Sequence, residues 1–132
     1  VLISGDGSFH MNLNELTTLA SYNLPIVVLV MNNRVLGMVR QWQDLFYEKR
    51  YSATVLDDGV DYVKLAEAMG ATGYRATTRE TFNEALKAAL AAKTPVVIDC
   101  VIGCDDKVWP MVAPGADIST AFTGEDLAAA QS

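Results

Sequence analysis

The sequence contains little of what disulfide-rich or metal-cluster proteins depend on, with two cysteines and one histidine among 132 residues. Two cysteines cannot build a disulfide framework or a four-ligand zinc site, so we interpret Cys100 and Cys104 as thiols in a reducing compartment. Positive charge is also scarce: ten Lys and Arg against sixteen Asp and Glu give a formal net charge of −6. Because a nucleic-acid partner needs a basic surface, this balance argues against one.

Long hydrophobic runs are absent as well. The longest run, Ile26 to Met31, is far shorter than the roughly 20 residues that cross a bilayer, and no signal-peptide pattern opens the chain. We therefore expect a cytoplasmic protein without a membrane partner. The chain opens on the β-type residues Val1 to Ser4 with no initiator Met, so we expect a domain of a longer polypeptide.

Hydrophobic residues make up 51% of the sequence and fall into alternating strand and helix patterns. Apolar runs predict strands at 1–4, 26–31 and 95–101, the last interrupted only by Asp99, and 73–76 is a weaker candidate. Helical patterns cover 12–24, 37–48, 61–69, 77–90 and 125–130. Strands that alternate with helices predict a three-layer α/β fold, a doubly wound and mostly parallel sheet.

Local signals refine the predicted element ends. Asn12 is expected to cap the first helix, with Met11 packing on Leu16 as a hydrophobic staple. Thr77 and Glu80 form a capping-box pattern, and Gly70 is a natural helix end. Loops are expected over 50–60, which contains Asp57-Asp58-Gly59, and over most of 103–132.

Polar clusters follow two neighbouring strands of the predicted sheet, Gly5-Asp6-Gly7-Ser8 and Asn32-Asn33. Asp6 and Asn33 are 27 residues apart, one strand–helix–strand interval, so both are expected at the same edge of the sheet. Carboxylate and amide oxygens suit Mg²⁺, which is completed by water and substrate phosphates. Gly5 and Gly7 allow close approach of a phosphate, and Ser8 can donate to it. Each fragment alone is also typical of an ordinary turn, but the joint spacing favours a site.

Other chemistries fit less well. The run Gly5 to His10 lacks the third glycine of a dinucleotide fingerprint, and no Gly-Lys-Ser/Thr phosphate loop is present. A Ser-His-Asp hydrolase would need His10, yet no nucleophile elbow accompanies it. His10 is therefore interpreted first as a polar loop residue that lies near the predicted site.

These residues resemble a known family. Gly5-Asp6-Gly7 followed by Asn32-Asn33 is similar to the cofactor motif of the thiamine-diphosphate-dependent decarboxylase superfamily, which has a flavodoxin-like thiamine-diphosphate-binding fold. The stretch Leu36–Gln43, with Phe46-Tyr47, Arg50-Tyr51-Ser52 and Val108–Gly115, resembles the acetolactate synthase large subunit in particular. The resemblance identifies residues 1–115 as the C-terminal cofactor domain and 116–132 as a tail.

The resemblance implies roles for individual residues. Asp6, the Asn33 side chain and the Val35 backbone carbonyl would bind Mg²⁺, which anchors the diphosphate of thiamine diphosphate. The remaining cofactor contacts would come from Gly5, Gly7, Ser8, Met11, Gly37 and Met38. Met38 and Trp42 would shape the substrate channel where sulfonylurea and imidazolinone inhibitors bind. Without the resemblance, Met11 reads as a staple residue and Trp42 as an ordinary buried aromatic.

The implied parent enzyme is a transferase of branched-chain amino-acid biosynthesis, which decarboxylates pyruvate and condenses it with pyruvate or 2-oxobutyrate. Its activating glutamate and its FAD would belong to other domains, so no catalytic residue is assigned here and the isolated domain is expected to be inactive. The parent is expected to be a homodimer or homotetramer, with a possible regulatory small subunit. Glyoxylate carboligase, pyruvate oxidase and a non-catalytic binding or assembly module are the alternatives.

Overall fold

The computed structural model describes residues 1–56 and 59–130, so Asp57 and Asp58 of the predicted loop lie outside the described residues. The chain forms two compact units. The first comprises Val1–Leu36 with Val55–Cys104, and the second comprises Gly37–Thr54 with Asp105–Ser132. The predicted boundary at residue 115 falls inside the second unit.

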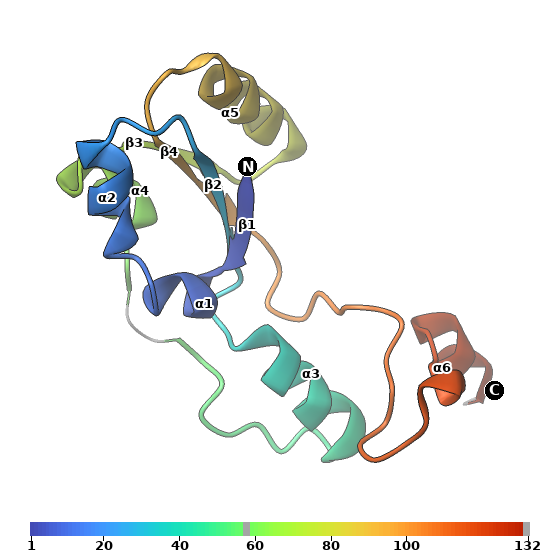
Figure 1. Cartoon of the computed structure of the whole chain (residues 1–132). Helices are drawn as coiled ribbons and strands as arrows, with labels where there is room; N and C mark the ends of the chain where they lie inside the picture. Colours follow the sequence, from blue (N-terminus) through green and yellow to red (C-terminus); the bar gives the residue numbers. More distant parts are fainter. Residues whose placement is uncertain (57–58, 131–132) are drawn as a thin grey trace. The chain divides into compact units, whose positions relative to one another are not determined.

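A parallel sheet forms the centre of the first unit (Figure 1). Its strands are β1 (Leu2–Gly5), β2 (Val27–Asn32), β3 (Thr72–Ala76) and β4 (Val96–Val101), in the order β1-β2-β4-β3. All four predicted strands are confirmed, including the weak candidate that became β3. β2 and β4 lie in the middle and are almost entirely buried, as their uninterrupted apolar sequences indicate.

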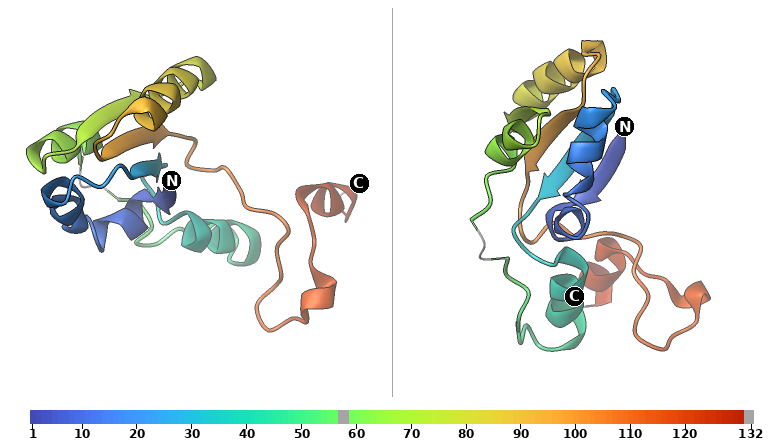
Figure 2. Two further views of the ribbon diagram at one scale, coloured as in Figure 1. Left: turned by 45° about the horizontal axis from the view of Figure 1, so that its top comes forward. Right: turned by 60° about the vertical axis from the view of Figure 1, so that its left-hand side comes forward.

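Helices cover both faces of this sheet, which confirms the three-layer α/β prediction (Figure 2). Val28 and Val30 of β2 face a core shared with α1 (Asp6–His10), α2 (Glu15–Ser21) and α4 (Tyr62–Ala68). Val27 and Leu29 point to the opposite face, where Ala85 and Ala89 of α5 (Arg79–Ala91) pack. The period-two alternation of β2 therefore separates two apolar clusters.

The start of the first helical region differs from the prediction. Gly5-Asp6-Gly7 is typical of an ordinary turn by its sequence, but α1 begins directly at Asp6. The predicted 12–24 helix is shorter, because α2 begins at Glu15 after a turn. Asn12 is not its cap, and Met11 is 74% exposed instead of stapling the helix start.

The two later helices of the first unit begin at side-chain caps. Asp61 caps α4 by accepting hydrogen bonds from the amides of Val63 and Lys64. The capping box of α5 uses Thr78 and Thr81, one residue later than the predicted Thr77 and Glu80. A threonine hydroxyl fills the role that the pattern assigned to a carboxylate. The predicted end of α4 is confirmed, since Gly70 has φ +86°.

The second unit contains α3 (Gly37–Phe46), a 3₁₀ turn (Ile118–Thr120) and α6 (Gly124–Ala130). The predicted 37–48 helix ends two residues early, where the backbone of Glu48 and Lys49 becomes left-handed. The predicted 125–130 helix is confirmed as α6. Among the described residues of both units, no helix combines the length and apolarity needed to span a membrane.

Candidate functional site

Asp6 sits where β1 passes into α1, and its side chain is nearly fully buried. One carboxylate oxygen accepts a hydrogen bond from the Gly7 amide at 2.8 Å. The other oxygen accepts a hydrogen bond at 2.7 Å from the backbone amide of Arg34, which lies in the loop that follows β2. Two backbone donors satisfy part of the carboxylate while leaving lone pairs on both oxygens. Asp6 thus ties the ends of β1 and β2 together.

Asn33 is the first residue after β2, and it shapes the loop that Asp6 contacts. Its side-chain oxygen accepts a hydrogen bond from the Val35 amide at 3.1 Å, which is an Asx-type turn. Arg34 between them is left-handed, with φ +57°. Val35 is buried and pairs with Val55 in an antiparallel bridge, so the loop is held on both sides.

The structure brings Asp6 and Asn33 to the same edge of the sheet, as the spacing predicted. Their side-chain oxygens accept from the amides of consecutive residues, Arg34 and Val35, so they lie within about 10 Å of each other. β1 and β2 are adjacent and parallel, with Gly5 beside Met31. The residue roles themselves remain predictions.

The donor chemistry of this edge fits Mg²⁺. The predicted ligands are a carboxylate, a carboxamide and a backbone carbonyl, all oxygen atoms and only one of them charged. Within residues 1–56 and 59–130, no group of three or more His, Cys, Asp and Glu side chains gathers into a metal cluster. Three oxygen ligands of this kind suit an ion that takes few protein ligands and relies on phosphate and water for the rest.

The glycines beside Asp6 have different surroundings. A Cβ atom at position 7 would approach Cδ2 of Leu36 to 2.8 Å, so Gly7 allows α1 to pack closely against the loop after β2. A Cβ atom at Gly5 would meet nothing within 4 Å. Ser8 lies in α1, and Met11 is the residue that ends it. A larger residue at position 7 would therefore have to displace the end of the Leu36 side chain.

The predicted channel residues belong to the second unit. Gly37 is the first residue of α3, and Met38 and Trp42 lie one turn apart on that helix. They line a cavity of about 680 Å³ together with Val39, Gln43, Tyr47 and Arg50. Met38 is half exposed, and Trp42 makes an edge-to-face contact with Phe46 at 5.8 Å between ring centroids. The structure brings Met38 and Trp42 to one apolar surface, as expected for residues four apart on a helix.

Gln41 is a residue whose role sequence reasoning missed. It is buried, its amide nitrogen donates to the Val108 carbonyl, and its amide oxygen accepts from the Val108 amide, both at 2.9 Å. This pair of bonds joins the two segments that carried the narrower resemblance, Leu36–Gln43 and Val108–Gly115. Lys107 and Asp44 add an ion pair of 2.7 Å, which lowers the pKa of the Asp44 carboxyl and raises that of Lys107.

His10 lies at the end of α1 and contacts the core. Its Nε2 atom lies 2.8 Å from the Tyr62 hydroxyl, and the two rings are tilted against each other at 5.6 Å. Tyr62 in turn packs edge-to-face on Phe9. His10 therefore anchors α1 to α4. The interpretation of His10 as a loop residue is wrong, because α1 begins at Asp6 and includes it.

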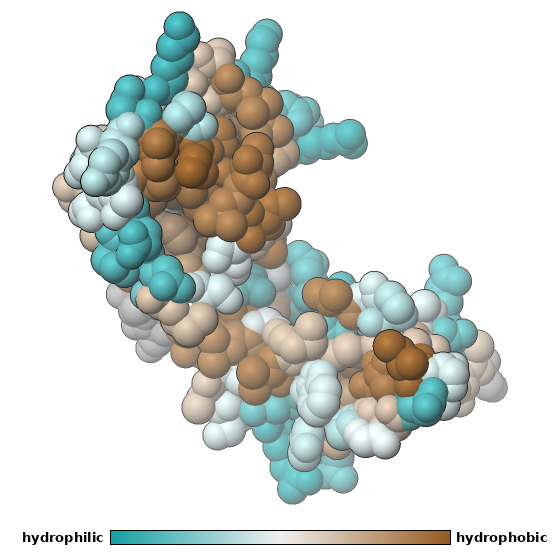
Figure 3. All heavy atoms as spheres, in the orientation of Figure 1, coloured by the Kyte–Doolittle hydropathy of each residue, from teal (hydrophilic) through white to brown (hydrophobic). Residues whose placement is uncertain are grey.

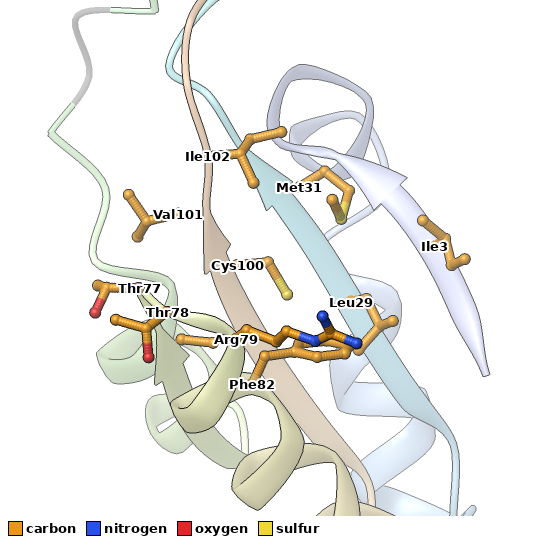
Figure 4. A pocket seen from close by; sticks show the side chains of 11 residues that line it. Ile3, Leu29, Met31, Thr77, Thr78, Arg79, Phe82, Cys100, Val101 and Ile102 are labelled. Atoms are coloured by element: carbon orange, nitrogen blue, oxygen red, sulfur yellow. The ribbon is translucent and has the colours of Figure 1, made fainter. Parts of the chain in front are cut away.

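An apolar cavity of about 520 Å³ lies elsewhere in the first unit, on the face of the sheet that α5 covers (Figure 4). Ile3, Leu29, Met31 and Cys100 point into it from three strands, and Figure 3 shows apolar side chains gathered over this unit. Burial raises the pKa of the Cys100 thiol, which makes it a poor nucleophile. Among the described residues that line this cavity there is no carboxylate.

Comparison with known proteins identifies the class to which this fold and edge belong. The family model described as the thiamine pyrophosphate enzyme, C-terminal TPP binding domain, matches residues 1–100. The chain therefore belongs to this family. A solved structure, the thiamine diphosphate-dependent 4-hydroxybenzoylformate decarboxylase of Rhodococcus jostii RHA1, superposes with a TM-score of 0.71 and 32% identity over 76% of this chain and 19% of that one.

Within the family, the sequence resembles acetolactate synthase large subunits. It is 45% identical over 116 residues to the Pyropia yezoensis large subunit, covering 87% of this chain and 20% of that protein. It is 44% identical over 119 residues to the isozyme 2 large subunit of Escherichia coli K12, covering 90% of this chain and 22% of that protein. The chain spans about a fifth of the length of these relatives. The predicted resemblance is confirmed.

Proposed function

We propose that this chain is the part of an acetolactate synthase that binds Mg²⁺ and, through it, thiamine diphosphate. Membership of the TPP-binding family supports the cofactor, and the identity to large subunits supports the enzyme. The observation that carries the metal site is the convergence of Asp6 and Asn33 on the consecutive amides of Arg34 and Val35. Asp6, the Asn33 side chain and the Val35 carbonyl hold the ion in this proposal.

Charge explains why a metal is needed. The chain has a formal net charge of −6, and the diphosphate group is also anionic. A divalent cation between the buried Asp6 carboxylate and the phosphates converts a repulsion into an attraction. Gly5, Gly7 and Ser8 contact the phosphates, and Met11, Gly37 and Met38 border the cofactor in this proposal. Met38 and Trp42 shape the channel for the keto acids.

The cofactor supplies the electron sink of the reaction, and this chain's residues supply anchoring and orientation. The proposed reaction decarboxylates pyruvate and joins the remaining two-carbon unit to a second 2-keto acid, pyruvate or 2-oxobutyrate. The glutamate that activates the cofactor and the FAD belong to other parts of the enzyme in this proposal. Isolated residues 1–132 are therefore expected to form no acetolactate, and the active enzyme is a homodimer or homotetramer.

The test is a binding measurement on Asp6→Ala in the full-length protein. We expect the unsubstituted protein to bind thiamine diphosphate only with Mg²⁺, and Asp6→Ala to lose this binding, because the one charged ligand and the hydrogen bond to the Arg34 amide disappear together. Isothermal titration calorimetry with and without Mg²⁺ measures both. Asp117→Ala removes an exposed carboxylate from the second unit and serves as the control, with unchanged affinity. Undiminished cofactor affinity in Asp6→Ala contradicts the proposal.

A further inference from the structure

A series of side-chain hydrogen bonds crosses the sheet beside the loop that is proposed to bind the metal ion. Asn32 is the last residue of β2. Its side-chain nitrogen Nδ2 donates to one carboxylate oxygen of Asp99 at 2.8 Å. Arg75 on β3 donates from Nε to the other Asp99 oxygen at 3.0 Å. Its Nη2 atom donates to Asp61, the cap of α4, at 2.7 Å. These hydrogen bonds thus link the end of β2 to the start of α4 through residues of β4 and β3.

Burial makes this arrangement demanding. Asn32 is 4% exposed and Asp99 is 1% exposed, and a buried carboxylate is tolerated only when it is paired. Arg75 supplies the pairing charge, and its hydrogen bond to Asp99 raises the pKa of the Arg75 guanidinium. Because a carboxylate only accepts, the Asn32 amide must present its nitrogen to Asp99.

This orientation leaves the side-chain oxygen of Asn32 buried without a hydrogen-bond partner. An unsatisfied buried acceptor lowers stability, because it loses its hydrogen bonds to water without gaining others. A buried aliphatic side chain at position 32 would avoid that cost, as at the preceding inward positions Val28 and Val30. Packing of the core alone therefore does not explain why an asparagine that contacts Asp99 stands at this position.

The position of Asn32 in the chain indicates this purpose. Its backbone carbonyl accepts from the Ile102 amide at 3.0 Å, and the next residue is Asn33, whose side chain closes on the Val35 amide. The end of β2 is thus fixed by its side chain and its backbone immediately before the proposed ligands. We infer that Asn32, Asp99 and Arg75 are positioning residues that hold the loop Asn33–Val35 in the geometry that receives the metal ion. This inference rests on the proposed function.

The test compares Mg²⁺ affinity with stability in the full-length protein. Asn32→Ala, and Asn32→Ser as a milder break, remove the contact to Asp99 without touching a proposed ligand. We expect the Mg²⁺ dissociation constant, titrated at saturating thiamine diphosphate, to rise roughly tenfold, as is typical when a residue that orients a ligand is lost. Val97→Ala is the matched control, since Val97 is buried on the same face of β4 as Asp99 but takes no part in these side-chain hydrogen bonds. It is expected to lower the Tm measured without Mg²⁺ and to leave the Mg²⁺ affinity within twofold.

Asp99→Asn gives a rescue arm. An asparagine at 99 can accept from Arg75 with its oxygen and donate with its nitrogen to the Asn32 oxygen, so Mg²⁺ affinity is expected to stay within twofold. Unchanged Mg²⁺ affinity in both Asn32 variants overturns the positioning role alone. Equal losses of affinity in Asn32→Ala and Val97→Ala, in proportion to Tm, also overturn it, because the effect is then general destabilisation. An unsubstituted protein that binds neither Mg²⁺ nor thiamine diphosphate overturns the proposed function as well.

Discussion

Each of the two units of the chain is stabilised internally in a different way. The first has a parallel sheet with two aliphatic clusters, in which the central strands β2 and β4 are buried on both faces. Among the described residues of the second unit, the buried ones are Gln41, Thr54 and Met111, of which two are polar. The second unit relies instead on side-chain ties such as Gln41 to Val108 and on edge-to-face contacts between aromatic rings.

This difference matches the division of the proposed site. The ligands for a metal ion must be held within fractions of an ångström, and Asp6 and Asn33 sit at the end of the rigid sheet. The residues of the proposed channel, Met38 and Trp42, lie on a helix with a half-exposed apolar surface. A substitution that creates a cavity beside the sheet is therefore expected to lower the free energy of unfolding more than most substitutions in the second unit.

The largest effect is expected from Ile98→Ala in β4. Ile98 is fully buried in the first unit, and removing three carbon atoms there should lower the free energy of unfolding by about 2–5 kcal/mol. Urea denaturation followed by far-ultraviolet circular dichroism measures the loss. Leu90→Ala on the exposed side of α5 is the control and is expected to change stability by less than about 1 kcal/mol. A loss from Ile98→Ala no larger than from the control would contradict the buried-sheet account.

Gln41→Leu is expected to weaken the second unit by about 1–3 kcal/mol, because the Val108 amide and carbonyl lose a buried partner. Both tryptophans of the chain, Trp42 and Trp109, lie in this unit, so tryptophan fluorescence reports its unfolding separately. The fluorescence midpoint in urea should fall while the midpoint from circular dichroism stays close to that of the unsubstituted protein.

Gln43 provides a matched comparison for that experiment. It makes the same two bonds to the backbone of Ser52, each at 3.1 Å, but in an exposed position. Water can replace them, so Gln43→Leu is expected to shift the fluorescence midpoint much less. Equal shifts for the two variants would show that burial of Gln41 is not what stabilises the unit.

Trp42→Leu tests the division of roles between the units. We expect about tenfold weaker inhibition by a sulfonylurea, equivalent to about 1.4 kcal/mol, with Mg²⁺ affinity unchanged, because Trp42 lines the cavity on α3 and lies outside the first unit. Inhibition curves of the full-length enzyme and Mg²⁺ titrations measure the two quantities. Phe46→Leu removes the partner ring without altering the residues that line the cavity, and its inhibition curve should not change.

The smallest effect concerns pH. The hydrogen bond from Lys107 holds the pKa of Asp44 below its ordinary value of 3.8. A depressed carboxyl pKa adds stability that is present above pH 3.8 and is lost as the pH falls through the lowered value. Asp44→Asn should therefore reduce stability at pH 7 by less than about 1 kcal/mol and have less effect near pH 2. Fluorescence-detected urea curves at both pH values check this, and an equal loss at both would contradict it.

The sequence predicts the parts of the fold that depend on local pattern. The uninterrupted apolar runs became β2 and β4, and the spacing of Ala85 and Ala89 with their neighbours became α5. The helix α1 was missed because two glycines next to Asp6 favour a turn locally. What the local pattern does not contain is the burial of Phe9 of α1 in a core shared with Tyr62 and Ala66, residues far away in the chain.

The same limit applies to the candidate site. The juxtaposition of Asp6 and Asn33 follows from one strand–helix–strand interval, which the sequence contains in full. The contacts of Asn32 with Asp99 and of Asp99 with Arg75 require the strand order β2-β4-β3, which no local pattern reveals. One signal was available: Asp99 is an acid inside an otherwise apolar strand, and such a residue needs a buried partner.

The most direct test of the metal site is a crystal structure of the full-length protein with Mn²⁺ and thiamine diphosphate bound. Anomalous scattering identifies the ion without assumptions about its ligands. We predict a single anomalous peak at about 2.2 Å from an Asp6 carboxylate oxygen, the Asn33 side-chain oxygen and the Val35 carbonyl, with two diphosphate oxygens and a water molecule completing the octahedral shell. A peak coordinated by other residues, or diphosphate bound at this edge with no metal ion between it and Asp6, would contradict the account.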